Sequence, residues 1–139
     1  MSEAQKIQFE LVSPEEKLVS EPVSMAVVPG VEGEMGVMAG HSSFVVALKP
    51  GVVQLYVEEG KQPGRKIFIA GGFADITADN CTVLAEAAVN VKDLNRTAIE
   101  QDIANLREDL GLAAEEADKA RIQGKIDLAQ ARLEAAIQG

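Results

Sequence analysis

The chain has 139 residues, enough for one ordinary domain or for a small domain with an appendage. Hydrophobic residues make up 47% and charged residues 25%, which argues against disorder, and the net charge of −9 disfavours a general electrostatic surface for nucleic acid or anionic lipid. A single cysteine cannot form an internal disulfide, so the fold must be stable without one.

The sequence shows no sign of a targeting or membrane-spanning segment. The first ten residues, MSEAQKIQFE, contain no apolar core of signal-peptide length and are not rich in arginine. No apolar run approaches the roughly 18 residues that a membrane-spanning helix needs. We therefore expect a soluble, cytoplasmic protein without direct membrane insertion, whose link to any membrane passes through a partner.

Short apolar segments separated by Gly, Pro and Asn run from Lys6 to about Ala88. We expect strands over residues 7–12, 17–20, 23–28, 44–48, 52–58, 65–70, 73–77 and 81–87. Because no helix-length segment separates them, they favour an antiparallel β-sandwich or barrel over parallel βαβ units. Cys81 shares a strand face with Val83 and Ala85, which indicates a buried structural thiol.

Residues 32–51 are unusually rich in glycine and carry the only histidine. Gly33, Gly36 and Gly40 mark places where the backbone turns tightly or something approaches it closely. Together with Glu32, Glu34 and His41, this segment is either a functional surface or a demanding turn.

The pattern becomes helical from Asp93 onwards. Ile99, Ile103, Leu106 and Leu110 recur at spacings of four, three and four, which predicts one face of a helix that Asp93 or Asn95 can cap. Gly111 predicts a left-handed stop, with Leu112 folded back onto the last turn.

A second helix is predicted from about Ala113. Its apolar stripe consists of Ile122, Ile126, Ala129, Leu133 and Ile137. The short join makes the two helices antiparallel, while the alanine-rich seam and Gly124 predict marginal stability. Such a hairpin is either mobile, able to dock, undock or extend, or permanently packed on the β-domain. The fold class is thus α+β, with an N-terminal antiparallel β-sandwich over 1–90 and an antiparallel two-helix hairpin over 91–139.

Few residues could support catalysis. Ser42 and Ser43 adjoin His41, but adjacency in sequence is not the geometry of a triad. The segment 30–36 resembles a phosphate loop superficially, yet it lacks the Gly-Lys-Ser/Thr end and no helix follows. Glu32 and Glu34 could act as acid and base, although carboxylates on a loop are more often solvated. We expect no catalytic, cofactor or metal site, and keep a small hydrolase using His41 as a minor alternative.

Five short motifs resemble the epsilon-subunit family of the bacterial rotary proton-translocating ATP synthase, the counterpart of the mitochondrial delta subunit. They are Glu32-Gly-Glu-Met-Gly-Val37, Gly40-His41, Lys49-Pro-Gly51, Gly71-Gly72-Phe73 and Thr82-Val-Leu-Ala-Glu86. The resemblance implies a ten-stranded sandwich with a two-helix tail, without a catalytic site.

It further implies a non-catalytic central-stalk (rotor) subunit that joins the gamma subunit to the ring of c subunits and couples proton translocation to ATP synthesis. Such a subunit is peripheral, on the cytoplasmic face of the bacterial inner membrane. A permanent rotor joint predicts exposed apolar faces on the isolated sandwich. The alternative is a β-sandwich protein-interaction adaptor outside ATP synthase.

The resemblance also implies which residues contact partners. The ring-facing residues would be Glu32, Glu34, Met35, Gly36, Gly40 and His41. The alternatives are that Glu34 is merely solvated and that the His41 ring bonds to local backbone.

In some members of the family the hairpin extends and inhibits ATP hydrolysis, with basic residues meeting an acidic segment of the catalytic beta subunit. The candidate cations here are Arg107, Lys119, Arg121, Lys125 and Arg132. Residues 93–139 contain six basic and ten acidic residues, a net charge of −4, and the two kinds interleave in sequence. Regulation by this tail is therefore expected to be weak.

Some members bind ATP on the hairpin through the motif (Ile/Leu)-Asp-x-x-Arg-Ala. This chain reads Leu94-Asn95-Arg96-Thr97-Ala98-Ile99, so an amide replaces the carboxylate and a methyl replaces the guanidinium. We expect no tight ATP binding.

Overall fold

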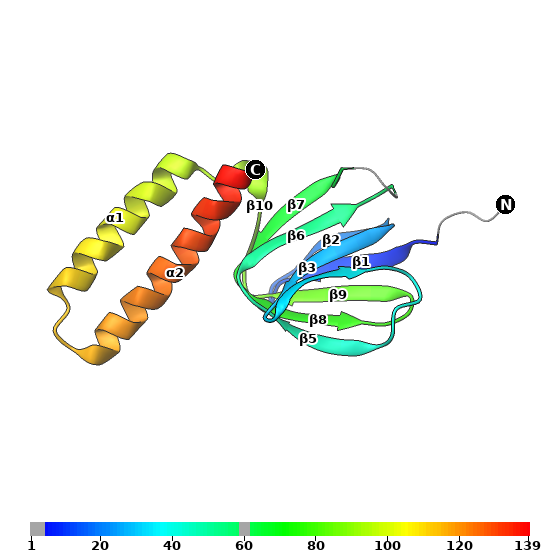
Figure 1. Cartoon of the computed structure of the whole chain (residues 1–139), viewed down its shortest axis with the longest axis horizontal. Coiled ribbons are helices and arrows are strands. Elements are labelled where there is room, and N and C mark those ends of the chain that lie inside the picture. The colour runs from blue at the N-terminus through cyan, green and yellow to red at the C-terminus, as the bar shows by residue number, and fades with distance from the viewer. Residues whose placement is uncertain (1–4, 59–61) are drawn as a thin grey trace. The chain divides into compact units, whose positions relative to one another are not determined.

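A computed structural model describes residues 5–58 and 62–139. The chain divides into two compact units, Met1–Asn90 and Val91–Gly139. The first contains the strands and the second contains the helices (Figure 1).

The first unit is a ten-stranded sheet that forms a sandwich, as predicted (Figure 1). Its strands are β1 (Ile7–Val12), β2 (Lys17–Val23), β3 (Met25–Gly30), β4 (Gly33–Val37), β5 (Phe44–Leu48), β6 (Gly51–Tyr56), β7 (Arg65–Ile69), β8 (Gly72–Ile76), β9 (Asn80–Ala85) and β10 (Ala88–Asn90). The order is β10-β7-β6-β3-β5-β8-β9-β1-β2, and β4 pairs with β3. Every pair is antiparallel except β1 with β9.

Two of these strands were not predicted. β4 was expected to be a glycine-rich loop, but only Gly33 lies at the turn and Gly36 continues the strand opposite Val27. The expected strand over 81–87 ends at Ala85, and the chain then forms the three-residue β10 beside β7. Glycine inside a strand and a strand of three residues both give little periodic signal.

The core consists of inward-facing residues that recur at alternate positions along the strands. Ile7, Phe9 and Leu11 of β1 are fully buried, and the residues between them are partly exposed. Cys81 is also fully buried, which confirms the structural interpretation of the thiol. Burial, helped by the negative charge of Asp75, raises the pKa of Cys81 to about 12, so the thiol stays protonated at neutral pH.

The second unit comprises the 3-10 turn η1 (Val91–Asp93), α1 (Arg96–Leu112) and α2 (Glu116–Gln138). The side chain of Asn95 caps α1 by accepting a hydrogen bond from the Ala98 N–H at 3.0 Å. The seam between the helices buries Ile99, Ile103 and Ala129, with Leu106 and Leu133 packed against them. No helix among the described residues is long and apolar enough to cross a membrane.

The predicted end of the first helix was wrong. Gly111 does not have a positive φ, α1 continues to Leu112, and the chain leaves the helix at Ala113. Leu112 is 79% exposed and does not fold back onto the helix. Glycine in a helix costs only about 1 kcal/mol, so the last turn tolerates it and residues 113–115 make the reversal. Near the end of α2, Ala135 is buried and Ile137 is exposed, contrary to the predicted stripe.

Candidate functional site

A two-residue turn at Val31 and Glu32 joins β3 to β4. Gly30 pairs with Gly33, and a Cβ on Gly30 would lie 2.8 Å from the Gly33 carbonyl oxygen. Gly33 has a φ of +141°, a conformation that favours glycine. The Val31 N–H donates to the carbonyl of Ala47 at 3.1 Å, which anchors the turn to β5. Two glycines and one main-chain bond therefore fix the shape of this turn.

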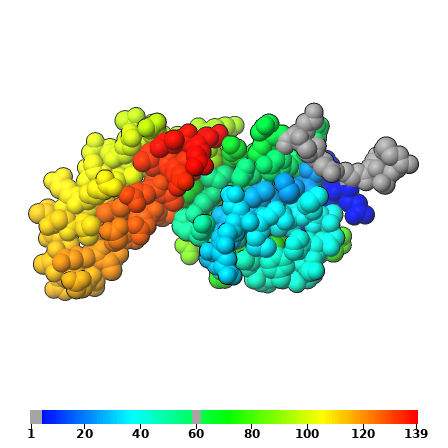
Figure 2. All heavy atoms as spheres, in the orientation of Figure 1, coloured from blue at the N-terminus to red at the C-terminus, as the bar shows by residue number. Residues whose placement is uncertain are grey.

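The carboxylates of this hairpin face solvent. Glu32 and Glu34 are both exposed, and neither forms an ion pair within 4.0 Å among the described residues. Met35 is half-buried and packs against the core, while Gly36 is exposed. The hairpin thus presents negative charge above an apolar base. Figure 2 shows cyan residues from this part of the chain over much of the visible face of the first unit.

His41 lies on a second segment, residues 38–43, beyond the other end of β4. The Gly40 N–H donates to the carbonyl of Ala78 at 2.8 Å, so this segment rests on the turn between β8 and β9. Gly40 has a φ of +87°. The half-buried His41 ring lies against Phe44, with centroids 5.1 Å apart, and Nδ1 is 3.0 Å from the carbonyl oxygen of Ser42.

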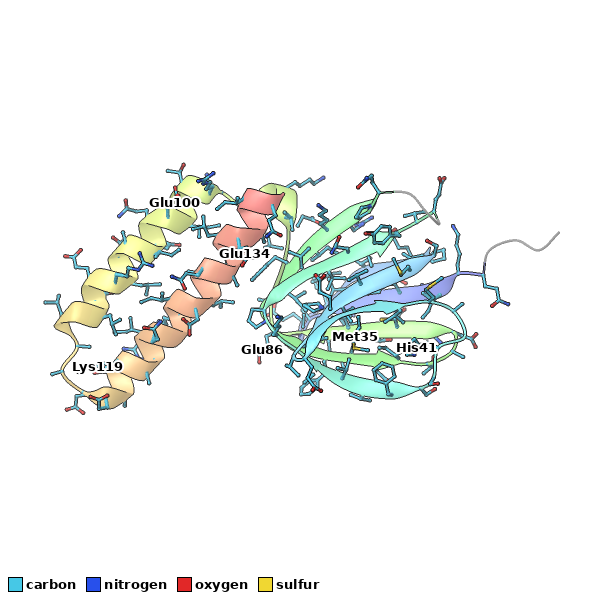
Figure 3. The ribbon with its side chains drawn as sticks, in the orientation of Figure 1. Met35, His41, Glu86, Glu100, Lys119 and Glu134 are labelled. Atoms are coloured by element: carbon cyan, nitrogen blue, oxygen red, sulfur yellow. The ribbon has the colours of Figure 1, made fainter. Side chains whose placement is uncertain are left out.

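The structure therefore separates residues that the sequence analysis treated as one loop. A strand rises about 3.3 Å per residue, so the four residues from Glu34 to Met38 span roughly 13 Å. In the view of Figure 3 the labelled Met35 and His41 fall in the same region of the first unit, so their separation is inferred from the length of β4. Because the His41 nitrogen contacts a main-chain carbonyl and not a serine hydroxyl, the geometry gives no support to a serine nucleophile. Among the described residues, no group of three His, Cys, Asp or Glu side chains could hold a metal.

An exposed row of apolar side chains crosses four strands of the sheet. Ala47 pairs with Phe73, Phe73 with Leu84, and Leu84 with Val12. Phe73 is 55% exposed and Leu84 is 49% exposed. We call these four residues the apolar row. Val45, two residues before Ala47, extends it and is also exposed. Exposed apolar faces were expected from the sequence, but this row could not be located there because its residues become neighbours only through strand register.

Three of the five candidate hairpin cations lie together on one helix face, and the other two lie apart from them. Lys119 pairs with Glu116 at 3.6 Å, and Arg107 is exposed on α1. The other three, Arg121, Lys125 and Arg132, are four and seven residues apart, so they lie on one face of α2.

Acidic residues that alternate with these cations in sequence lie elsewhere on the helix. Asp127 and Glu134 each follow a cation by two residues, which places them about 200° further around α2. Only Asp118 is next to the basic face, where it pairs with Arg121 at 3.6 Å. Asp127 and Glu134 therefore lie away from the face formed by Arg121, Lys125 and Arg132, whereas Glu116 and Asp118 pair with cations at the start of α2.

Comparison with known proteins gives a consistent family. Residues 6–91 match the family described as "ATP synthase, Delta/Epsilon chain, beta-sandwich domain". The ATP synthase epsilon chain of Rhodospirillum centenum is 42% identical over 134 residues, 94% of this chain and 92% of that protein. The epsilon chain of Rhizobium meliloti is 46% identical over 120 residues, 86% of this chain and 87% of that protein.

Solved structures agree with this match. A chain in the structure of the Euglena gracilis mitochondrial ATP synthase, covering OSCP, F1 and the c-ring, aligns with a TM-score of 0.81 at 28% identity, over 97% of this chain and 82% of that chain. A chain of the Tetrahymena thermophila mitochondrial ATP synthase shares the fold, with a TM-score of 0.67 at 12% identity, over 97% of this chain and 99% of that chain. This chain therefore belongs to the delta/epsilon family of ATP synthase subunits.

Proposed function

We propose that this chain is the epsilon subunit of a bacterial ATP synthase and joins the gamma subunit to the c-ring within the central stalk. The observation that carries the proposal is the match to proteins named ATP synthase epsilon chain over both the sandwich and the hairpin. This match confirms the family inferred from the five sequence motifs and favours a stalk subunit over an adaptor outside ATP synthase. The chain is then a non-catalytic subunit, held at the cytoplasmic face of the inner membrane by its partners.

In this proposal the apolar row contacts gamma. Exposed phenylalanine and leucine side chains at adjacent register positions are unfavourable in water, and burying them stabilises a complex by about 25 cal/mol per Å². A joint that transmits torque needs a persistent interface, and such interfaces have apolar centres. The row lies on four hydrogen-bonded strands, so it forms a rigid surface.

The two segments beside β4 contact the c-ring. The turn at Glu32 and Glu34 supplies exposed carboxylates without cation partners among the described residues, and Met35 and Gly36 lie next to it. The second segment supplies Gly40 and the half-buried His41. Main-chain bonds hold both segments in place, which lowers the entropic cost of docking.

The basic face of α2 is a candidate contact for an acidic segment of the catalytic beta subunit. Its cations lie together, which supports such a contact, but residues 93–139 carry a net charge of −4. We therefore propose modest inhibition of ATP hydrolysis. Truncation after Lys92 should raise hydrolysis by the whole enzyme a few-fold. Unchanged hydrolysis with retained coupling would make the hairpin purely structural.

Tight ATP binding on the hairpin is not part of the proposal. The Asn95 side chain already accepts the capping hydrogen bond from Ala98, and the Arg96 Nε lies 3.5 Å from a Glu100 carboxylate oxygen. Both groups that could replace the missing motif residues are therefore engaged locally. Calorimetry that finds micromolar ATP affinity would contradict this part.

Co-purification with gamma tests the proposed interface. The double variant Phe73→Ser/Leu84→Ser should lower the affinity for gamma at least about tenfold, since each side chain would lose roughly 1.5 kcal/mol or more of burial. Leu112→Ser, which changes an exposed leucine in the hairpin, is the matched control and should bind normally. Equal binding of gamma by both variants would show that the apolar row is not part of the interface.

A further inference from the structure

One edge of β4 has no neighbouring strand in the described part of the chain. β4 pairs with β3 alone, so its other edge is open. The remaining open edges are less suited to pairing. β2 contains Pro22 and has an irregular register at its other end, opposite Leu11 and Val12, and β10 has only three residues. β4 has five residues and no proline.

The main-chain groups of Glu34 point towards this open edge. Glu34 lies opposite Pro29, which has no N–H and whose carbonyl accepts the Lys49 N–H at 2.9 Å on the other side of β3. Pro29 and Glu34 therefore form a non-hydrogen-bonded pair, which leaves the N–H and carbonyl of Glu34 facing away from β3. The two-residue period of a strand gives Gly36 the same orientation.

These groups are accessible to a partner. Both residues are exposed, and neither makes a main-chain hydrogen bond outside the β3–β4 ladder to any described residue. Gly36 has no side chain to obstruct an incoming backbone. Glu32 and Glu34 add negative charge without an internal cation partner among the described residues.

We propose that the open edge of β4 binds a subunit of the c-ring by strand addition. The occupant is an extended segment of the partner with a lysine or arginine beside Glu34. Backbone bonds to Glu34 and Gly36 supply affinity, and the charge pair fixes the register. This inference rests on the proposed function, because it explains how the surface around Glu34 engages a stalk subunit.

A pair of substitutions at Glu34 separates backbone pairing from charge. Glu34→Pro removes the outward N–H and leaves the β3 ladder intact, because the opposing pair is not hydrogen-bonded. Glu34→Gln keeps the N–H and removes the charge. In binding to ATP synthase depleted of this subunit, Glu34→Pro should weaken affinity about tenfold and Glu34→Gln only two- to threefold.

Hydrogen exchange on the unmodified subunit gives a second readout that needs no variant. The amides of Glu34 and Gly36 should exchange at least about tenfold more slowly in the assembled enzyme than in the free subunit. If both amides exchange as in the free subunit and the two variants lose equal affinity, strand addition is refuted while the charged docking surface stands. If neither variant weakens binding, β4 is not a contact. If the unmodified subunit fails to bind the depleted enzyme, the proposed function itself fails.

Discussion

Gly72→Ala is the substitution with the largest expected effect on the sandwich. Gly72 has a φ of +147°, and a Cβ there would overlap the carbonyl oxygen of Leu84 and lie 3.0 Å from the Cα of Ala85. Both obstructing atoms belong to the backbone of the neighbouring strand β9, so neither can move without disturbing the ladder. The unfavourable φ costs about 1–3 kcal/mol, and overpacking adds typically about 1–3 kcal/mol.

The expected loss is therefore roughly 2–6 kcal/mol of unfolding free energy, a large fraction of the total for a domain of this size. Each kcal/mol lowers Tm by about 4–8 °C in a domain of 60–100 residues, so Tm should fall by at least about 8 °C. Denaturant titration of the purified chain, followed by circular dichroism, measures the free energy, and calorimetry measures Tm.

Two other glycines distinguish the cost of the positive φ from the cost of the steric overlap. Gly33 also has a positive φ but nothing lies within 4 Å of its added Cβ, so Gly33→Ala should lose only the backbone cost of about 1–3 kcal/mol. Gly36 lacks a positive φ, and its Cβ would meet only the flexible Met25 Sδ at 3.2 Å, so Gly36→Ala should be nearly neutral. A Gly72→Ala variant as stable as Gly36→Ala would refute the close approach of β8 to β9.

Three further substitutions test the hairpin and the core. Asn95→Ala should cost α1 about 1 kcal/mol by removing the N-cap bond, seen as lower helicity in circular dichroism. Gly124→Ala should stabilise α2 by about 0.5–1 kcal/mol, because nothing lies within 4 Å of the new Cβ. Because burial raises the pKa of Cys81 from 9.0 to about 12, its contribution to unfolding free energy is full below pH 9.0 and falls as pH rises towards 12. Denaturant titrations above pH 9.0 should show a shallower decline for Cys81→Ala than for the unmodified chain.

The β-domain could be predicted from local patterns where strands alternate cleanly. Ile7, Phe9 and Leu11 are buried at every second position, as their spacing indicated. β4 escaped prediction because Gly36 resembles a turn residue when its partner strand is unknown. Gly111 led to the opposite error, because it was predicted to end α1 but lies inside the helix. Whether a helix ends at a glycine depends on whether the hydrogen bonds of the last turn outweigh the energetic cost of that glycine.

The proposed docking surfaces depend on information that a linear sequence does not hold. Phe73 and Leu84 become neighbours only through the register of β8 with β9. The sequence motifs grouped Glu34 with His41, whereas β4 separates them. Conversely, the 3.6-residue helical period places Lys125 and Arg132 together on α2, so the basic face could have been found by applying that period to the charges as well as to the apolar residues.

The central claim is that this chain makes the rotor joint through which proton flow drives ATP synthesis. Its most direct test is proton-driven ATP synthesis by the enzyme in lipid vesicles, prepared without this subunit and then supplied with it. The account predicts that the unmodified chain restores synthesis and that Phe73→Ser/Leu84→Ser does not at equal concentration. Equal rates of ATP synthesis with and without the subunit would contradict the claim.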